Sequence, residues 1–142
     1  MSLVVDTNVL VYASLLGSTF HALARKRLLD LKAGGENLVV TTQVLREYVA
    51  VVTRRVGEKP LSVPDALDDV ARFRKAFVVL ADPPDVLERW LSLVHRHGVK
   101  GAACHDAFLV AVALGNGVEG ILTHNTKHFE PFDELRIVPL VI

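Results

Sequence analysis

The chain alternates short, wholly apolar runs with longer segments whose apolar residues recur every three or four positions. A short apolar run rich in valine predicts a strand that is buried on both faces, and the longer pattern predicts a helix. Strands are expected at residues 3–5, 38–40, 77–80, 120–123 and 136–140. Helices are expected at residues 8–14, 21–32, 43–54, 62–75, 82–97 and 107–114. This alternation predicts an α/β fold with a mostly parallel sheet, and Pro139 places the last strand at its edge.

Polar side chains stand where these apolar runs end. Asp6 directly follows the first strand, and Asn125 follows the strand at 120–123. Glu47 lies within the apolar pattern of its helix, and Asp106 opens a helix that is otherwise nearly all apolar. Ligands of parallel α/β sheets bind at the carboxyl ends of the strands, so we expect these four side chains to meet at that edge. The alternative for Asp6 is that it only caps the following helix.

Clustered carboxylates repel one another, and they persist where a cation or a shared proton compensates their charge. Carboxylate and amide oxygens are hard ligands that suit Mg²⁺ or Mn²⁺. Such a metal lowers the pKa of bound water and neutralises charge during attack on a phosphodiester. The pattern therefore predicts a metal site at Asp6, Glu47, Asp106 and Asn125.

Composition narrows the class of protein. The 142 residues suit a single domain, expected to span residues 1–142. The 16 basic and 16 acidic residues cancel, so there is no overall positive field of the kind that marks many nucleic-acid binders. The single cysteine, Cys104, excludes an internal disulfide, and no apolar stretch is long enough for a membrane span. We therefore expect a soluble, cytoplasmic protein.

Four motifs together resemble the PIN-domain ribonucleases, and within them the VapC-like toxins of toxin–antitoxin pairs. They are VDTNVL at residues 5–10, TQVLRE at 42–47, GAACHDA at 101–107, and LTHN at 122–125 with HF at 128–129. Their order and spacing carry the resemblance, which covers nearly the whole chain. The family carries its metal-binding acids at the positions that match Asp6, Glu47 and Asp106.

The resemblance implies a three-layer α/β/α sandwich and Mg²⁺- or Mn²⁺-dependent cleavage of RNA. It also implies a homodimer that is inhibited by a small antitoxin protein from a neighbouring gene. Many members have an aspartate where this chain has Asn125, so the fourth ligand here is neutral and binding of a second metal is in question. Thr7 and Thr123 match positions where the family uses a hydroxyl to place ligands or water, although each also suits simple capping.

Other polar residues lie beside the motifs or on the predicted helices. Arg46, Lys100, His124 and Lys127 lie beside the motifs and are candidate contacts to RNA phosphates, the alternative being ordinary surface residues. The acidic residues early in the helix at 62–75 follow the helix dipole, so no chemistry is assigned to them. His95 and His97 are expected at the surface.

Two other functions compete with a ribonuclease. A non-catalytic PIN-like module would hold RNA or a protein without cutting, and the neutral Asn125 favours it. A phosphoryl-transfer enzyme of the receiver or haloacid-dehalogenase type also places an aspartate after its first strand. Those enzymes need a second acid close by in the sequence, and residues 6–8 supply none.

Overall fold

The computed structural model describes residues 1–54 and 59–142. Five strands are present: β1 (Ser2–Val5), β2 (Asn37–Thr41), β3 (Val78–Leu80), β4 (Gly120–Thr123) and β5 (Arg136–Pro139). The described helices are α1 (Thr7–Ser14), α2 (His21–Ala33), α3 (Thr42–Thr53), α4 (Val63–Ala76), α5 (Val86–His97), α6 (Ala103–Gly115) and α7 (Thr126–Phe129). All the predicted strands and helices are confirmed, with ends that differ by a few residues. The predicted loop at residues 57–60 falls partly outside the described residues.

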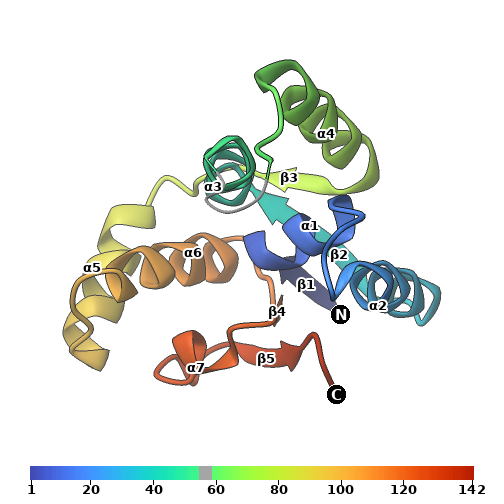
Figure 1. The fold of residues 1–142 in the computed structure, drawn as a ribbon. Helices are drawn as coiled ribbons and strands as arrows, with labels where there is room; N and C mark the ends of the chain where they lie inside the picture. Colours follow the sequence, from blue (N-terminus) through green and yellow to red (C-terminus); the bar gives the residue numbers. More distant parts are fainter. Residues whose placement is uncertain (55–58) are drawn as a thin grey trace.

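The strands form one parallel sheet in the order β3-β2-β1-β4-β5. Since β1 lies at the centre, the chain first builds outward to β3 and then crosses back to add β4 and β5 on the other side of β1. Figure 1 shows α2 and the α5–α6 pair on opposite sides of the sheet. The α/β sandwich with a parallel central sheet is therefore confirmed.

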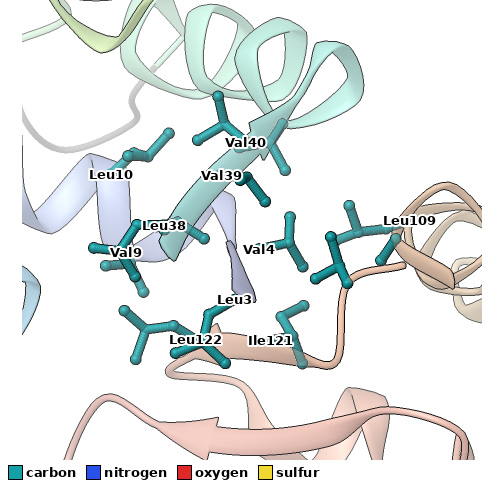
Figure 2. Packing of buried hydrophobic residues seen from close by; sticks show 14 of the residues in the cluster. Leu3, Val4, Val9, Leu10, Leu38, Val39, Val40, Leu109, Ile121 and Leu122 are labelled. Carbon is teal, nitrogen blue, oxygen red and sulfur yellow. The ribbon is translucent and has the colours of Figure 1, made fainter. Parts of the chain in front are cut away.

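The core consists of aliphatic side chains from both faces of the sheet. Alternate residues of a strand point to opposite faces, and in Figure 2 Val4 is directed toward Leu109 of α6, whereas Leu3 lies toward Val9 of α1. All four side chains are buried. Because β1 is covered on both faces, the residue that follows it, Asp6, is held at a fixed place at the rim of the core.

Local sequence signals fix the start of α3 and the end of α5. The Thr41 hydroxyl accepts a hydrogen bond from the Val44 amide at 3.2 Å, so Thr41, a residue type that favours this position, caps α3. Gly98 ends α5 with a left-handed backbone (φ 60°), a conformation that glycine adopts without strain. No helix in the described part of the chain is long and apolar enough to cross a membrane.

One acidic residue of α4, Asp69, is buried. Its carboxylate accepts a 2.6 Å hydrogen bond from the Tyr48 hydroxyl and pairs with Arg72. Burial and this bond raise the pKa of Tyr48, so the phenol stays protonated. The interaction connects α4 to α3 and is structural.

Candidate functional site

The Asp6 carboxylate is held by three hydrogen bonds at the carboxyl end of β1. One oxygen, Oδ1, accepts from the Thr7 amide at 2.8 Å, so Asp6 is also the N-cap of α1. The other oxygen, Oδ2, accepts from the Thr123 hydroxyl at 2.8 Å and the Asn8 amide nitrogen at 3.1 Å. The capping role considered for Asp6 is thus present, together with contacts to a second strand.

Thr123 and Asn8 connect the ends of β1 and β4. Thr123 is fully buried, and its hydroxyl donates to Asp6 while accepting from the Asn125 amide at 3.0 Å. The Asn8 side chain donates to Asp6, and its oxygen accepts from the His124 amide at 3.0 Å. These bonds fix the orientation of the Asp6 carboxylate, because donors from both α1 and β4 hold it.

Glu47 approaches from α3 and corrects one prediction. It was expected within the apolar face of its helix, but the residue is exposed beside that face. The Thr7 hydroxyl donates to Glu47 Oε2 at 2.9 Å, and the Gln43 amide donates to Glu47 Oε1 at 3.2 Å. The Thr7 hydroxyl therefore positions an acid, in addition to the role of the Thr7 amide at the helix cap.

Gln43 is buried and links two elements of the site. Its Nε2 also donates to the His105 carbonyl in the first turn of α6, at 3.0 Å. Both partners of Nε2 are hydrogen-bond acceptors, so the amide nitrogen of Gln43, and not its oxygen, must face them. Its oxygen, Oε1, is buried with no hydrogen-bond partner among the described residues. Gln43 thereby holds Glu47 at a fixed place relative to the helix that carries Asp106.

Asp106 lies in the first turn of α6 and is partly buried. Its nearest basic group is the His128 ring of α7, with 3.8 Å between Nδ1 and Oδ2. Among the described residues no side chain or amide donates a hydrogen bond to the Asp106 carboxylate. Its oxygens are therefore the least engaged of the three acids.

Burial is the main cause that raises the pKa of Asp6, and the charge of Glu47 adds to the rise. Burial likewise raises the pKa of Asp106, and the charges of Asp6 and Glu47 reinforce it while His128 opposes it. The three carboxylates thus act on one another electrostatically, as expected for residues brought to one edge of the sheet. We call Asp6, Glu47 and Asp106 the acid site.

Four other residues predicted for the site are exposed on the surface: Asn125, Arg46, Lys100 and Lys127. Asn125 is exposed just beyond β4; its backbone is bonded to Thr123, and no hydrogen bond of its side chain occurs within the described ranges. Arg46 is exposed on α3 and lines a cavity next to Glu47. Lys100 and Lys127 are exposed, on the loop before α6 and on α7.

His124 differs from the other candidate contacts to RNA, because its ring packs against other aromatic rings. Its centroid lies 4.6 Å from that of Phe20 and 5.5 Å from that of Tyr12. Much of the imidazole is therefore covered by these neighbours. This packing favours a structural role for His124 over a contact to a phosphate.

The donors of the acid site fit a hard divalent cation. Among the described residues His128 is the closest counter-ion to the three carboxylates, and a cation would relieve the repulsion that adds to the raised pKa values of Asp6 and Asp106. The ligand oxygens of the three acids do not all lie within 4.8 Å of one another, a spacing found in the described chain only for His97, Asp133 and Glu134. Mg²⁺ keeps several of its water molecules in proteins, so water can bridge this wider spacing.

A second charged group lies away from the acid site and is neutralised by the protein. The Glu134 carboxylate lies 2.9 Å from His97 Nε2 and 3.4 Å from Arg96, and Arg96 also approaches Asp133 at 3.8 Å. We call these four residues the paired cluster. His97 was predicted at the surface, but it is largely buried between Glu134 and the Phe132 ring.

Sequence reasoning missed the contributions of Asn8, Gln43 and His128 to the site. Each has a local explanation, since Asn8 suits a helix start and Gln43 and His128 suit ordinary helix positions. Each also has a partner 22 or more positions away along the chain, which only folding brings into contact. In the sequence, only their positions within or beside the four motifs indicated that these residues belong to the site.

The sequence model of the PIN domain matches residues 3–135 of the chain. No curated protein sequence gives a significant match. The fold is similar to the solved structure of VapBC2 from Rickettsia felis bound to a DNA fragment from its promoter, with a TM-score of 0.73, 16% identity and 98% of each chain covered. It is similar to VapBC-1 from nontypeable Haemophilus influenzae, with a TM-score of 0.73, 15% identity and 100% of each chain covered.

A third similar structure is VapC20 from Mycobacterium tuberculosis, described as a toxin that cleaves the sarcin-ricin loop. Its TM-score is 0.66 at 20% identity, and the similarity covers 94% of this chain and 98% of VapC20. At these identities the three structures establish a shared fold.

Proposed function

This chain belongs to the PIN-domain family, and from that premise we propose that it is a metal-dependent endoribonuclease, the toxin of a toxin–antitoxin pair. The observation that carries the proposal is the acid site, in which three carboxylates meet and no cationic side chain within residues 1–54 and 59–142 closely pairs with them. In this proposal the whole chain, residues 1–142, forms one nuclease domain.

The residues have distinct roles in the proposed reaction. Asp6, Glu47 and Asp106 would hold Mg²⁺ or Mn²⁺, with the Asn125 amide as a neutral fourth ligand. The metal supplies an activated water and neutralises charge on the phosphate that is attacked. Thr123 keeps Asp6 oriented, while Thr7 and Gln43 keep Glu47 in place. Arg46, Lys100 and Lys127 are the candidate contacts to RNA phosphates.

The geometry of Asp6 argues against phosphoryl transfer of the receiver or haloacid-dehalogenase type. A nucleophilic aspartate needs an accessible oxygen, but Asp6 is 8% exposed and both of its oxygens accept hydrogen bonds. An oriented, enclosed carboxylate is better suited to hold a cation at its remaining lone pairs.

The test is cleavage of RNA by the purified chain. We expect cleavage with Mg²⁺ or Mn²⁺, its loss with a chelator, and its return when excess metal is added. Cleavage that persists in chelator contradicts the metal mechanism. RNA that is retained but not cut under all of these conditions identifies a binding module instead.

The fold shared with VapBC proteins supports a small antitoxin as partner, and we propose that the chain forms a homodimer which this antitoxin inhibits. Expression of the chain alone should arrest growth, and co-expression of a short protein from the adjacent gene should relieve the arrest. Normal growth during expression of the active chain contradicts the toxin role without affecting the nuclease proposal.

A further inference from the structure

A cavity of about 500 Å³ opens directly beside the acid site, between α3 and α6. Its walls are one face of α3, formed by Gln43, Arg46, Glu47 and Ala50, and the first two turns of α6, which contribute His105 and Phe108. Glu47 belongs to both the cavity and the acid site. A polymer cut at the acid site therefore has this cavity next to the cleaved bond.

The walls combine flat side chains with charges of both signs. Phe108 is half-buried and offers an aromatic surface, and Arg46 and His105 are exposed planar groups. Unstacked nucleobases of single-stranded RNA bind on aromatic rings and on guanidinium planes. A metal or phosphate site has no need of the aromatic wall, whereas a base does.

The amide of Gln43 is not free to read the edge of a base. Both bonds of its Nε2 go to Glu47 and the His105 carbonyl, and its Oε1 is buried. Recognition in this cavity would then rest on stacking, which tolerates different bases because every base has a flat face.

A protein surface is a weaker candidate occupant. The cores of protein interfaces are depleted of glutamate, and Glu47 lies in the wall of this cavity with its carboxylate held by Thr7 and Gln43. Exposed apolar side chains lie away from this cavity, for example Leu87 and Leu91 on α5.

We propose that this cavity is a subsite for the nucleobase adjacent to the cleaved phosphodiester, with Phe108 as the stacking surface. The inference rests on the proposed ribonuclease function, and it adds that the substrate is single-stranded where it meets α3 and α6. An RNA base-paired at that nucleotide cannot enter, because its bases stack on their own neighbours.

The test compares two fluorescent probes by anisotropy, in the Asp106→Asn background with Mg²⁺ present. The first probe is an RNA of ten adenosines, and the second is a ten-unit ribose-phosphate chain without bases. Phe108→Leu keeps an apolar side chain but removes the ring, and we expect it to weaken binding of the first probe by roughly fivefold or more. Binding of the second probe should not change.

Two control variants sharpen the result. Phe108→Tyr keeps the ring and should retain binding of the adenosine probe, and Leu87→Ala removes an exposed apolar side chain elsewhere and should have no effect. Melting temperatures of all variants establish that they are folded. If the melting temperature of Phe108→Leu is lowered, Phe108→His, which also has a flat ring, is measured beside Phe108→Tyr in its place. Loss of binding of the adenosine probe in both of these variants overturns stacking.

Equal affinity of Phe108→Leu and its parent for the adenosine probe overturns the subsite, as does an equal loss for both probes. Sedimentation of the variants gives a third outcome. A dimer that becomes a monomer in Phe108→Leu identifies the cavity as an interface between copies and overturns the proposal. Failure of the wild-type chain to cut RNA with any metal is a separate result that concerns the proposed function.

Discussion

The acid site and the paired cluster both gather acidic side chains, but they differ in how their charge is neutralised. In the paired cluster, burial acts to raise the pKa of Glu134, but the hydrogen bond to His97, the other hydrogen bonds of the carboxylate and the charge of His97 together lower it. In the acid site, burial and mutual repulsion raise the pKa of Asp6 and Asp106. The protein stabilises the first group and leaves the second electrostatically unfavourable.

This difference shows which group is fitted for an external cation. The acids of the paired cluster already have His97 and Arg96, so a metal would have to displace or face these basic groups. The acid site has the weaker counter-ion, His128, at 3.8 Å. A group kept in an unfavourable charge state is a better candidate for function than one that stabilises the fold.

Asp106→Asn should produce the largest effect. It removes the acid with the least engaged oxygens, so metal-dependent RNA cleavage should fall by about 10²-fold or more, since a metal ligand contributes several kcal/mol to catalysis. In chelator the melting temperature should not fall, because the change relieves repulsion. A joint loss of cleavage and thermal stability would assign Asp106 a structural role.

Glu134→Gln is the matched change in the paired cluster. It should leave RNA cleavage unchanged but lower the free energy of unfolding by about 1–2 kcal/mol, because the hydrogen bond to His97 is weakened and the ion pair with Arg96 is lost. Chemical denaturation measures the loss. A large fall in cleavage with unchanged stability would reverse the roles assigned to the two groups.

Gln43→Met should separate positioning from stability. It removes the donors to Glu47 and His105, so metal affinity should fall by about tenfold, the lower range for residues that orient metal ligands. Stability should be little changed, because the unpartnered Oε1 is removed as well and methionine fills a similar volume. Calorimetric titration of Mn²⁺ is the measurement, and equal affinities would show that Gln43 does not act on the site.

The pH dependence of stability should have opposite signs in the two groups. Asp6 and Asp106 have raised pKa values in the folded protein, so the folded state binds more protons than the unfolded state above their ordinary value of 3.8. The free energy of unfolding of the metal-free protein should therefore fall as pH rises through that window. Glu134, with its pKa lowered from 4.5, stabilises at higher pH and loses its contribution as pH falls.

Denaturation of the metal-free protein between about pH 3 and pH 8 tests these signs. Asp106→Asn should reduce the decline toward neutral pH, and Glu134→Gln should flatten the acidic limb. Identical profiles for both variants would contradict the contrast between the groups.

Asn125→Asp should have the smallest effect. It adds a negative charge beside the acid site, but the residue is exposed, so water screens the charge. Mn²⁺ should bind about two- to fivefold more tightly, and the metal-free protein should be slightly less stable. If calorimetry finds no change in affinity, Asn125 is not a ligand and serves the turn after β4 instead.

The strands and helices were predictable because their signals are local. The apolar residues of β1, the Thr41 cap and the Gly98 stop each act within a few residues of their own position. The edge where Asp6, Glu47 and Asp106 meet was also predictable, because parallel strands share their carboxyl ends.

Burial and partners of individual charges were not predictable. Glu47 was expected inside an apolar face and is exposed, while His97 was expected at the surface and is largely buried against Glu134. These outcomes depend on how each helix packs against its neighbours. The helical pattern of either segment alone does not contain that information.

The bond between Thr123 and Asp6 spans 117 positions of the chain, which has a consequence for synthesis. Translation at about 5–20 residues per second leaves Asp6 without this partner for roughly 6–23 seconds. A ribosome-bound chain that ends before β4 already holds all three acids, yet it lacks the strand that completes the sheet beside β1. The site thus assembles only after β4 has been translated, so truncated products and nascent chains that lack β4 should be inert toward the RNA around them.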